Sequence, residues 1–241
     1  MRVSASFPRY FVTGLLAALS LVAASISCAD VPDATLIGPI AADPPGHPSK
    51  NSIYSASAIE LQANGYLEEE YFIRGTANRY ELGGLGTGAI VDGGHLCLTR
   101  LVVRRPRDAQ EFNGVVVVEW LNVTGGPDKD IDWWQSGPHL VRNGYAYVMV
   151  SAQQMGIDTM QQWSPLRYGD LDITNGGVVG NDALSFDIFS AVGKAITRAG
   201  EPLAANLDIL GGLRAEILIA TGHSQSASRL ATYLNNVHPL E

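Results

Sequence analysis

The sequence predicts an α/β protein with a mainly parallel sheet and flanking helices. Strand-like and helix-like segments alternate along the second half of the chain. Two of the strand-like segments, Val115–Leu121 and Tyr145–Ala152, are nearly continuous apolar runs, which is typical of strands buried on both faces. Alternation of this kind places helices on both faces of the sheet.

Composition limits the class of protein. The chain has 241 residues, of which 46% are hydrophobic and 17% charged, so it has enough apolar side chains for one globular domain and is not disordered. Sixteen basic and 24 acidic side chains give a net charge of −8. The densest basic group is Arg104, Arg105 and Arg107, which we interpret as a solvated strand end. We therefore expect no nucleic-acid partner.

The first 29 residues have the pattern of a signal peptide. Arg2 and Arg9 precede an apolar, uncharged run at 11–26, and the small residues Ser27-Cys28-Ala29 follow it. The run is about sixteen residues long, whereas a membrane span needs roughly 20. We expect cleavage after Ala29, a secreted or periplasmic protein, and no stable membrane insertion afterwards. The alternatives are an uncleaved anchor or a lipoprotein attached through Cys28.

Cleavage leaves a single cysteine, Cys97. An internal disulfide is then impossible, and a structural zinc site is excluded because zinc needs several clustered ligands. Cys97 lies in an alternating, strand-like segment, so we expect a small buried side chain rather than a reactive thiol.

The first half of the chain contains an arm and two strands. Residues 30–52 hold five prolines and predict an extended N-terminal arm. A helical or turn segment follows at 57–64 and ends at Gly65. Tyr66–Thr76 predicts a strand with exposed acidic side chains on one side, and Leu96–Arg104 a second strand. The glycine-rich stretch at 83–88 lies between strands, so it predicts a connection rather than a phosphate-binding loop.

Residues 53–241 are expected to belong to one domain, and in the second half of the chain helices lie between the strands. Asp132 and Gln135 have the spacing of a capping box, which predicts a short helix within Ile131–Asn143. About 28 residues after Ala152 form a long loop, a candidate lid. The clearest helix carries an apolar stripe from Leu184 to Ile196; Asn181 can cap it, and Gly200 and Pro202 end it. A last strand at 217–221 precedes a helix that begins at Gln225 or Ser226.

Ser224 is the clearest candidate for chemistry. It stands between the last strand and the last helix in the pattern Gly222-x-Ser224-x-Ser226. A serine on a tight strand-to-helix turn is typical of a nucleophile elbow, in which small residues two before and two after let the turn close. The helix that follows also supplies backbone N–H groups for an oxyanion. The alternative is an ordinary serine N-cap.

Several segments resemble the bacterial α/β-hydrolase domain-containing proteins, a branch of the α/β-hydrolase superfamily. The resemblance covers most of the chain after the N-terminal 29 residues. It is carried by EEEYFIRGTANRYE (68–81), VVVVEWLNVTGG (115–126), GYAYVMVSAQ (144–153), RYG (167–169), SFDIFSAVGKAI (185–196) and GHSQSASRLATYLNNVHPL (222–240).

The resemblance implies a serine hydrolase that acts on small-molecule esters or related acyl compounds, with no metal or organic cofactor. It implies an oxyanion hole with one donor from the backbone of Gln225. The second donor would come from Leu121, Asn122 or Val123, and we take Asn122 as the working choice. Many relatives carry Glu where this chain has His223, so we expect position 223 to be inessential.

A catalytic base is not evident. In this superfamily the acid and the histidine follow the serine, but the residues after Ser224 offer only His238 and Glu241. A helix over 226–236 would carry His238 roughly 15–18 Å from the serine. We therefore expect residues 53–241 to be the N-terminal part of the domain, incomplete at the C-terminal side of the sheet, with acid and base on sequence beyond Glu241. The alternatives are a truncated, non-catalytic protein or binding module, and a peptidase.

Other candidates have simpler explanations. Asp128, Asp130 and Asp132 resemble a calcium loop for three positions only, and Trp133 stands where that loop needs glycine. Arg229 is expected to form a structural ion pair or to be solvated. Four aromatic residues are candidates either for an acyl pocket or for packing: Trp133, Trp134, Trp163 and Tyr168.

Overall fold

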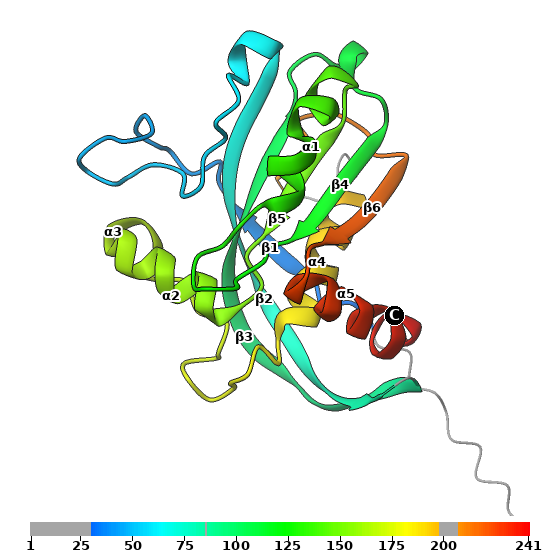
Figure 1. Cartoon of the computed structure of the whole chain (residues 1–241). Coiled ribbons are helices and arrows are strands. Elements are labelled where there is room, and N and C mark those ends of the chain that lie inside the picture. The colour runs from blue at the N-terminus through cyan, green and yellow to red at the C-terminus, as the bar shows by residue number, and fades with distance from the viewer. Residues whose placement is uncertain (1–29, 85, 198–206) are drawn as a thin grey trace, which may run out of the picture.

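The fold is built on a six-stranded sheet with helices on both faces (Figure 1). It was obtained as a computed structural model that describes residues 30–84, 86–197 and 207–241. The strands are β1 (Ala34–Ile37), β2 (Tyr66–Gly83), β3 (Gly86–Pro106), β4 (Val115–Trp120), β5 (Ala146–Val150) and β6 (Ile217–Gly222). The helices are α1 (Ile131–Arg142), α2 (Gln154–Trp163), α3 (Pro165–Tyr168), α4 (Ser185–Thr197) and α5 (Gln225–Asn236). Short 3-10 turns occupy η1 (Gln62–Asn64), η2 (Ala109–Glu111) and η3 (His238–Leu240).

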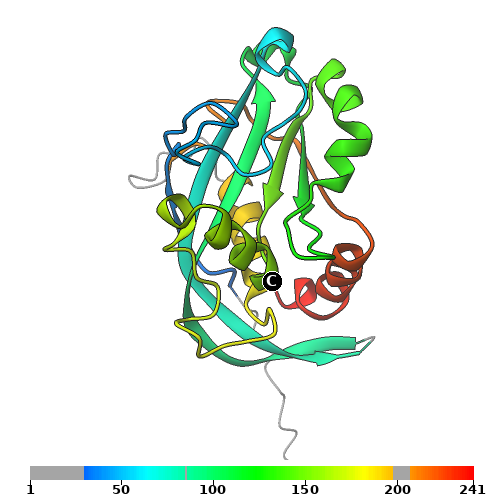
Figure 2. The ribbon, with the colours of Figure 1, turned by 60° about the vertical axis from the view of Figure 1, so that its left-hand side comes forward.

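The sheet is mixed, in the order β1-β2-β3-β5-β4-β6. The strands β5, β4 and β6 are mutually parallel, as the alternating pattern predicts, whereas β1, β2, β3 and β5 pair antiparallel. The antiparallel part arises because β2 and β3 form one long hairpin, closed where Gly83 pairs with Gly86. The glycine-rich stretch is thus a hairpin connection, as expected, and the hairpin curves beneath α5 (Figure 2).

The chain crosses the sheet twice in opposite directions. The crossover from β4 to β5 carries α1, and the crossover from β5 to β6 carries α4. Right-handed crossovers that run in opposite directions place their helices on opposite faces. Each face therefore has its own core. Trp133, Leu140 and Val141 of α1 pack on one face.

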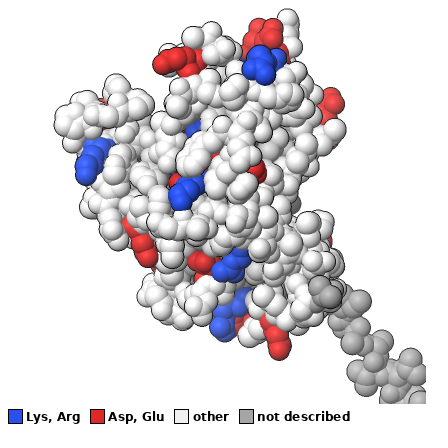
Figure 3. Space-filling model, viewed as in Figure 1, with Lys and Arg blue, Asp and Glu red and all other residues white. Residues whose placement is uncertain are grey.

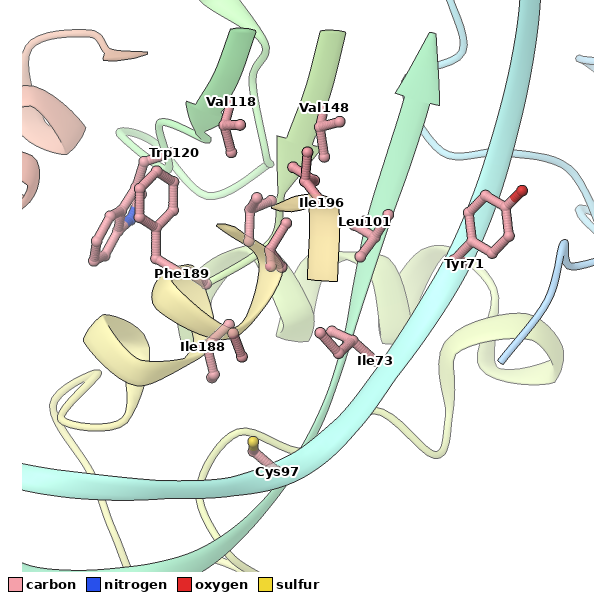
Figure 4. Close-up of a cluster of buried hydrophobic side chains, with 14 of the residues drawn as sticks. Tyr71, Ile73, Cys97, Leu101, Val118, Trp120, Val148, Ile188, Phe189 and Ile196 are labelled. Carbon is pink, nitrogen blue, oxygen red and sulfur yellow. The ribbon is translucent and has the colours of Figure 1, made fainter. Parts of the chain in front are cut away.

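The larger core lies on the other face, against α4 and α5. Trp120 of β4 stacks on Phe189 of α4 with ring centroids 5.0 Å apart (Figure 4). Cys97 belongs to this core, so the expectation of a buried side chain is confirmed, and burial raises the pKa of its thiol to about 11.

Three local expectations are wrong. The long loop after Ala152 contains α2 and α3, because the buried side chains Ile157 and Met160, three residues apart, give that segment an apolar helical face. The N-terminal arm includes β1, which pairs with β2. Asn181 does not cap α4, which begins four residues later. Gly200 and Pro202 lie outside the described residues.

Several charged residues of the hairpin are buried rather than solvated. Arg104 and Arg105, expected at a solvated strand end, are almost inaccessible, and so is Glu70 among the acidic residues expected on an exposed side. Arg104 Nε lies 2.8 Å from Glu68 Oε1, and Arg105 Nη2 2.8 Å from Glu69 Oε2. Acidic residues of β2 thus pair with arginines of β3 across the hairpin, which makes their burial possible.

The charged side chains that reach the surface are scattered. Lys and Arg form no continuous patch on the face shown in Figure 3. Within the described ranges, no helix has both the length and the apolar character needed to cross a bilayer. The expected signal peptide, residues 1–29, lies outside the described part of the chain.

Candidate active site

Ser224 occupies a strained turn between β6 and α5. Its backbone angles are φ 53° and ψ −109°, a conformation that side-chain-bearing residues rarely adopt. The turn is too tight for a side chain at Gly222, where a Cβ atom would lie 3.0 Å from the backbone carbon of Ser226. The side chain of Ser224 itself is exposed. The conformation, the exposure and the position after a parallel strand are those of a nucleophile elbow.

The hydroxyl of Ser226 closes this turn. It accepts a hydrogen bond from the N–H of His223 at 2.9 Å and donates one to the carbonyl of His223 at 3.0 Å. Ser226 is completely buried. Serine at the last position of the motif therefore fits the turn. Its hydroxyl is hydrogen-bonded to the N–H and the carbonyl of His223, and a glycine at this position could not form these two bonds.

Two backbone N–H groups near Ser224 have no hydrogen-bond partner among the described residues. One belongs to Gln225, the first residue of α5. The other belongs to Val123, in the loop after β4. The N–H of Leu121 donates to Val150 O at 3.3 Å, and that of Asn122 donates to Lys129 O at 3.1 Å. The working choice of Asn122 as a backbone donor is thus contradicted, because its N–H is already bonded, and Val123 is the remaining candidate of the three.

None of the five histidines hydrogen-bonds to Ser224 in the described structure. His47 and His95 lie near Asp43 and Asp92. His139 contacts the ring of Tyr145 at the end of α1. His238 packs against Tyr233, beyond the far end of α5.

His223 precedes Ser224 but faces α1. Its Nδ1 is 3.8 Å from Asp132 Oδ1, and Asp132 Oδ2 accepts a hydrogen bond of 2.6 Å from Thr221. Asp132 therefore joins α1 to the end of β6. Its side chain is not the helix cap that the sequence predicted, since the N–H of Asp132 donates to Glu119 Oε1 at 3.1 Å. A buried carboxyl group of β4 thus takes the capping role.

Glu119 is a buried acid directly below this cluster, paired in register with Thr221. Loss of solvation, with smaller contributions from the carboxylates of Asp132 and Asp130, raises its pKa from 4.5 to about 8. Among the described residues, its Oε2 atom has no hydrogen-bond partner. The neutral form is therefore favoured in the folded protein at neutral pH.

Replacing Glu119 by Gln is expected to flatten the dependence of stability on pH. With its raised pKa, Glu119 contributes stability that is fully present below pH 4.5 and is lost as the pH rises through about 8. The amide stays neutral, so Glu119→Gln should be more stable than the wild type at pH 9, by on the order of 3 kcal/mol, and similar at pH 4.5. Urea unfolding at pH 4.5, 7 and 9 measures this. Glu81→Gln, at an exposed position, is the control, and an equal effect of Glu119→Gln at all three pH values would contradict the prediction.

The three aspartates of the calcium-like stretch diverge. Asp128 Oδ2 accepts from Ser151 at 2.5 Å, Asp130 Oδ2 lies 2.5 Å from Arg104 Nη1, and Asp132 faces Thr221. Within the described ranges no group of three or more His, Cys, Asp or Glu side chains is placed to hold a metal ion.

The aromatic candidates are mainly packing residues. Trp133 lies against Tyr147, with centroids 5.0 Å apart, and Trp163 lies against Tyr54 and Tyr168. Trp134 alone of the four candidates is largely exposed. These contacts do not build an acyl pocket at Ser224.

Arg229 of α5 forms the expected ion pair, at 3.3 Å from Asp182 Oδ2. Asp182 also accepts hydrogen bonds from the N–H of Gln154 at 2.7 Å and from the side chain of Gln153 at 3.2 Å. Its φ angle, 53°, is positive like that of Ser224. Asp182 therefore joins α5 to the start of α2, a role that sequence reasoning missed because its three partners are distant in the chain.

A three-stranded parallel unit with a strained, exposed serine between its edge strand and a helix defines the α/β-hydrolase class of folds. Residues 38–241 match the family model described as Alpha/beta hydrolase domain, and the chain belongs to this family. No curated protein and no solved structure matches the chain. The family assignment confirms the resemblance to α/β hydrolases that the sequence suggests and supports hydrolase activity.

Proposed function

We propose that the protein is an exported serine hydrolase that cleaves small carboxylic esters, with Ser224 as its nucleophile. The observation that carries this proposal is the backbone of Ser224, held at φ 53° with an exposed side chain at the carboxyl end of a parallel strand. A strained conformation persists only where surrounding contacts hold it, and such conformations cluster at functional sites. Membership of the hydrolase family supports the same reading.

The proposed reaction uses the hydroxyl of Ser224 and the backbone N–H groups beside it. Ser224 Oγ attacks the ester carbonyl carbon while a general base takes its proton. The oxyanion accepts hydrogen bonds from the N–H groups of Gln225 and Val123. Collapse of this intermediate expels the alkoxide, which receives the proton from the base and leaves as an alcohol. Water then adds to the acyl-enzyme by the same route, and the acid departs with Ser224 restored.

We further propose that residues 1–29 are a signal peptide that is removed during export. Export follows from the signal-peptide pattern of residues 1–29. Expression in a bacterial host and mass analysis of the exported protein tests this part, with Asp30 expected as the first residue. A protein that keeps residues 1–29 would contradict cleavage.

The test of the function uses the purified protein. Matched p-nitrophenyl esters and p-nitroanilides are compared, and a fluorophosphonate probe is located by peptide mass mapping. We expect ester turnover, little anilide turnover, and labelling at Ser224. Anilide turnover without ester turnover would replace the esterase by a peptidase.

A non-catalytic binding module is the second candidate, favoured by the lack of any histidine contact with Ser224 in the described structure. The same experiment separates the two. A folded protein with no ester turnover and no labelling at Ser224 would support the binding module and contradict the hydrolase.

A further inference from the structure

The carbonyl oxygen of His223 accepts three hydrogen bonds. Asn122 Nδ2 donates at 2.7 Å, Ser226 Oγ at 3.0 Å and Ser226 N–H at 3.1 Å. This carbonyl belongs to the peptide unit that ends at the nitrogen of Ser224. Its orientation therefore fixes the rotation about the N–Cα bond of Ser224, which is the angle φ.

These hydrogen bonds oppose the strain at the nucleophile. A side-chain-bearing residue in such a conformation costs about 1–3 kcal/mol and relaxes unless its neighbours prevent it. Two of the three donors come from Ser226, on the same turn. The third comes from Asn122, which lies on a different element, 101 residues away in the chain.

Both polar atoms of the Asn122 side chain are hydrogen-bonded. Its Oδ1 accepts from the N–H of Thr124 at 2.9 Å. Its backbone exchanges two hydrogen bonds with Lys129, at 3.1 and 2.9 Å. Asn122 is almost completely buried, so its amide group is held against the loop that also contains Val123.

The place of Asn122 in the sheet explains this contact. The parallel pairing of β4 and β6 ends at Trp120 and Gly222, so the backbone ladder stops two residues before the serine. Beyond that point the chains continue into separate loops. The amide of Asn122 spans the gap and connects the loop after β4 to the turn after β6.

We propose that Asn122 is a positioning residue that fixes the nucleophile relative to the oxyanion loop through the carbonyl of His223. This proposal rests on the proposed function. It moves the role of Asn122 from its backbone, where the sequence placed it, to its side chain. Loss of the contact lets Ser224 and the Val123 N–H shift relative to each other, which affects the transition state more than substrate binding.

Asn122→Asp is the test, because it keeps the shape and the acceptor for Thr124 but replaces the donor by an oxygen that faces the carbonyl of His223. With a p-nitrophenyl ester we expect kcat to fall about 100- to 1,000-fold and KM to change less than about 3-fold. Backbone amide exchange of residues 223–226 is expected to accelerate at least about 10-fold, since local opening becomes easier. Asn122→Ser, which retains a hydroxyl donor, is expected to lose less.

Asn236→Asp is the matched control. Asn236 is equally buried, its Oδ1 accepts from Gly83 N–H at 2.6 Å, and its Nδ2 donates to Gly84 O and Thr232 O, but it lies at the far end of α5. This variant should lower the melting temperature without changing kcat or exchange at 223–226. If both variants change kcat and exchange in proportion to their loss of stability, Asn122 is structural only and the proposal is wrong.

The two proposals fail in different ways. A wild-type protein without ester turnover and without labelling at Ser224 would contradict the proposed hydrolase function. The exchange measurement would still test whether the hydrogen bond from Asn122 to the carbonyl of His223 holds the turn. An active wild type with unchanged kcat and unchanged exchange in Asn122→Asp would overturn the positioning role alone.

Discussion

Replacing Ser224 by alanine is expected to lower kcat for a p-nitrophenyl ester by about 10⁴- to 10⁶-fold, the largest effect of any single change. Removal of the nucleophile from a serine hydrolase leaves only the catalysis given by the oxyanion hole and binding. Alanine has no oxygen to form the acyl-enzyme, and Ser224 Oγ has no hydrogen-bond partner in the described structure whose loss would disturb the fold. The melting temperature should therefore stay within a few degrees.

Two further variants make this result specific. Ser228 lies one turn along α5 and is exposed, and the hydrogen bond from its Oγ to the carbonyl of Ser224 is long, at 3.4 Å. Ser228→Ala should therefore retain activity within about 3-fold. Ser224→Gly should be as inactive as the alanine variant but more stable by about 1 kcal/mol, because glycine adopts a positive φ without strain. Activity retained in Ser224→Ala would remove Ser224 as the nucleophile.

The elbow could be predicted from sequence because its signals are local. Gly222, Ser224 and Ser226 are adjacent in the chain, and the apolar strand before them and the helix after them are both visible as patterns. For the second donor of the proposed oxyanion hole, the sequence leaves three candidates. The choice between Asn122 and Val123 depends on whether the carbonyl of Lys129, seven residues after Asn122, accepts the N–H of Asn122. Hydrophobic periodicity does not show how this loop folds back.

The parallel half of the sheet was predictable for the same reason, since its strands are apolar runs separated by helical patterns. The long hairpin was only partly recognised. The pattern of Tyr66–Thr76 predicts exposed acidic side chains, but Glu68, Glu69 and Glu70 pair with arginines of the next strand. The opposite charges on two strands joined by a glycine-rich turn were the available signal for buried ion pairs.

Glu70 gives the second large effect, on stability rather than activity. It is fully buried and holds two arginines: Arg100 Nε lies 2.7 Å from its Oε1, and Arg167 Nε lies 2.7 Å from its Oε2. Tyr168 also donates to Oε1 at 2.9 Å. Glu70→Gln keeps the shape but removes the negative charge, so two buried guanidinium groups lose their main counter-charge. We expect the free energy of unfolding to fall by about 3–5 kcal/mol in urea titrations.

Glu69→Gln is the matched comparison on the same strand. Glu69 pairs with Arg105 at 2.8 Å but remains partly exposed, so solvent screens the interaction and the expected loss is about 1 kcal/mol or less. The contrast tests burial, since the substitution and the partner type are the same at both positions. Equal losses at 69 and 70 would show that the buried network contributes no more than a surface pair. A large loss at Glu70 alone would show that the buried carboxylate, which pairs with Arg100 of β3 and Arg167 of α3, stabilises the fold more than the partly exposed pair does.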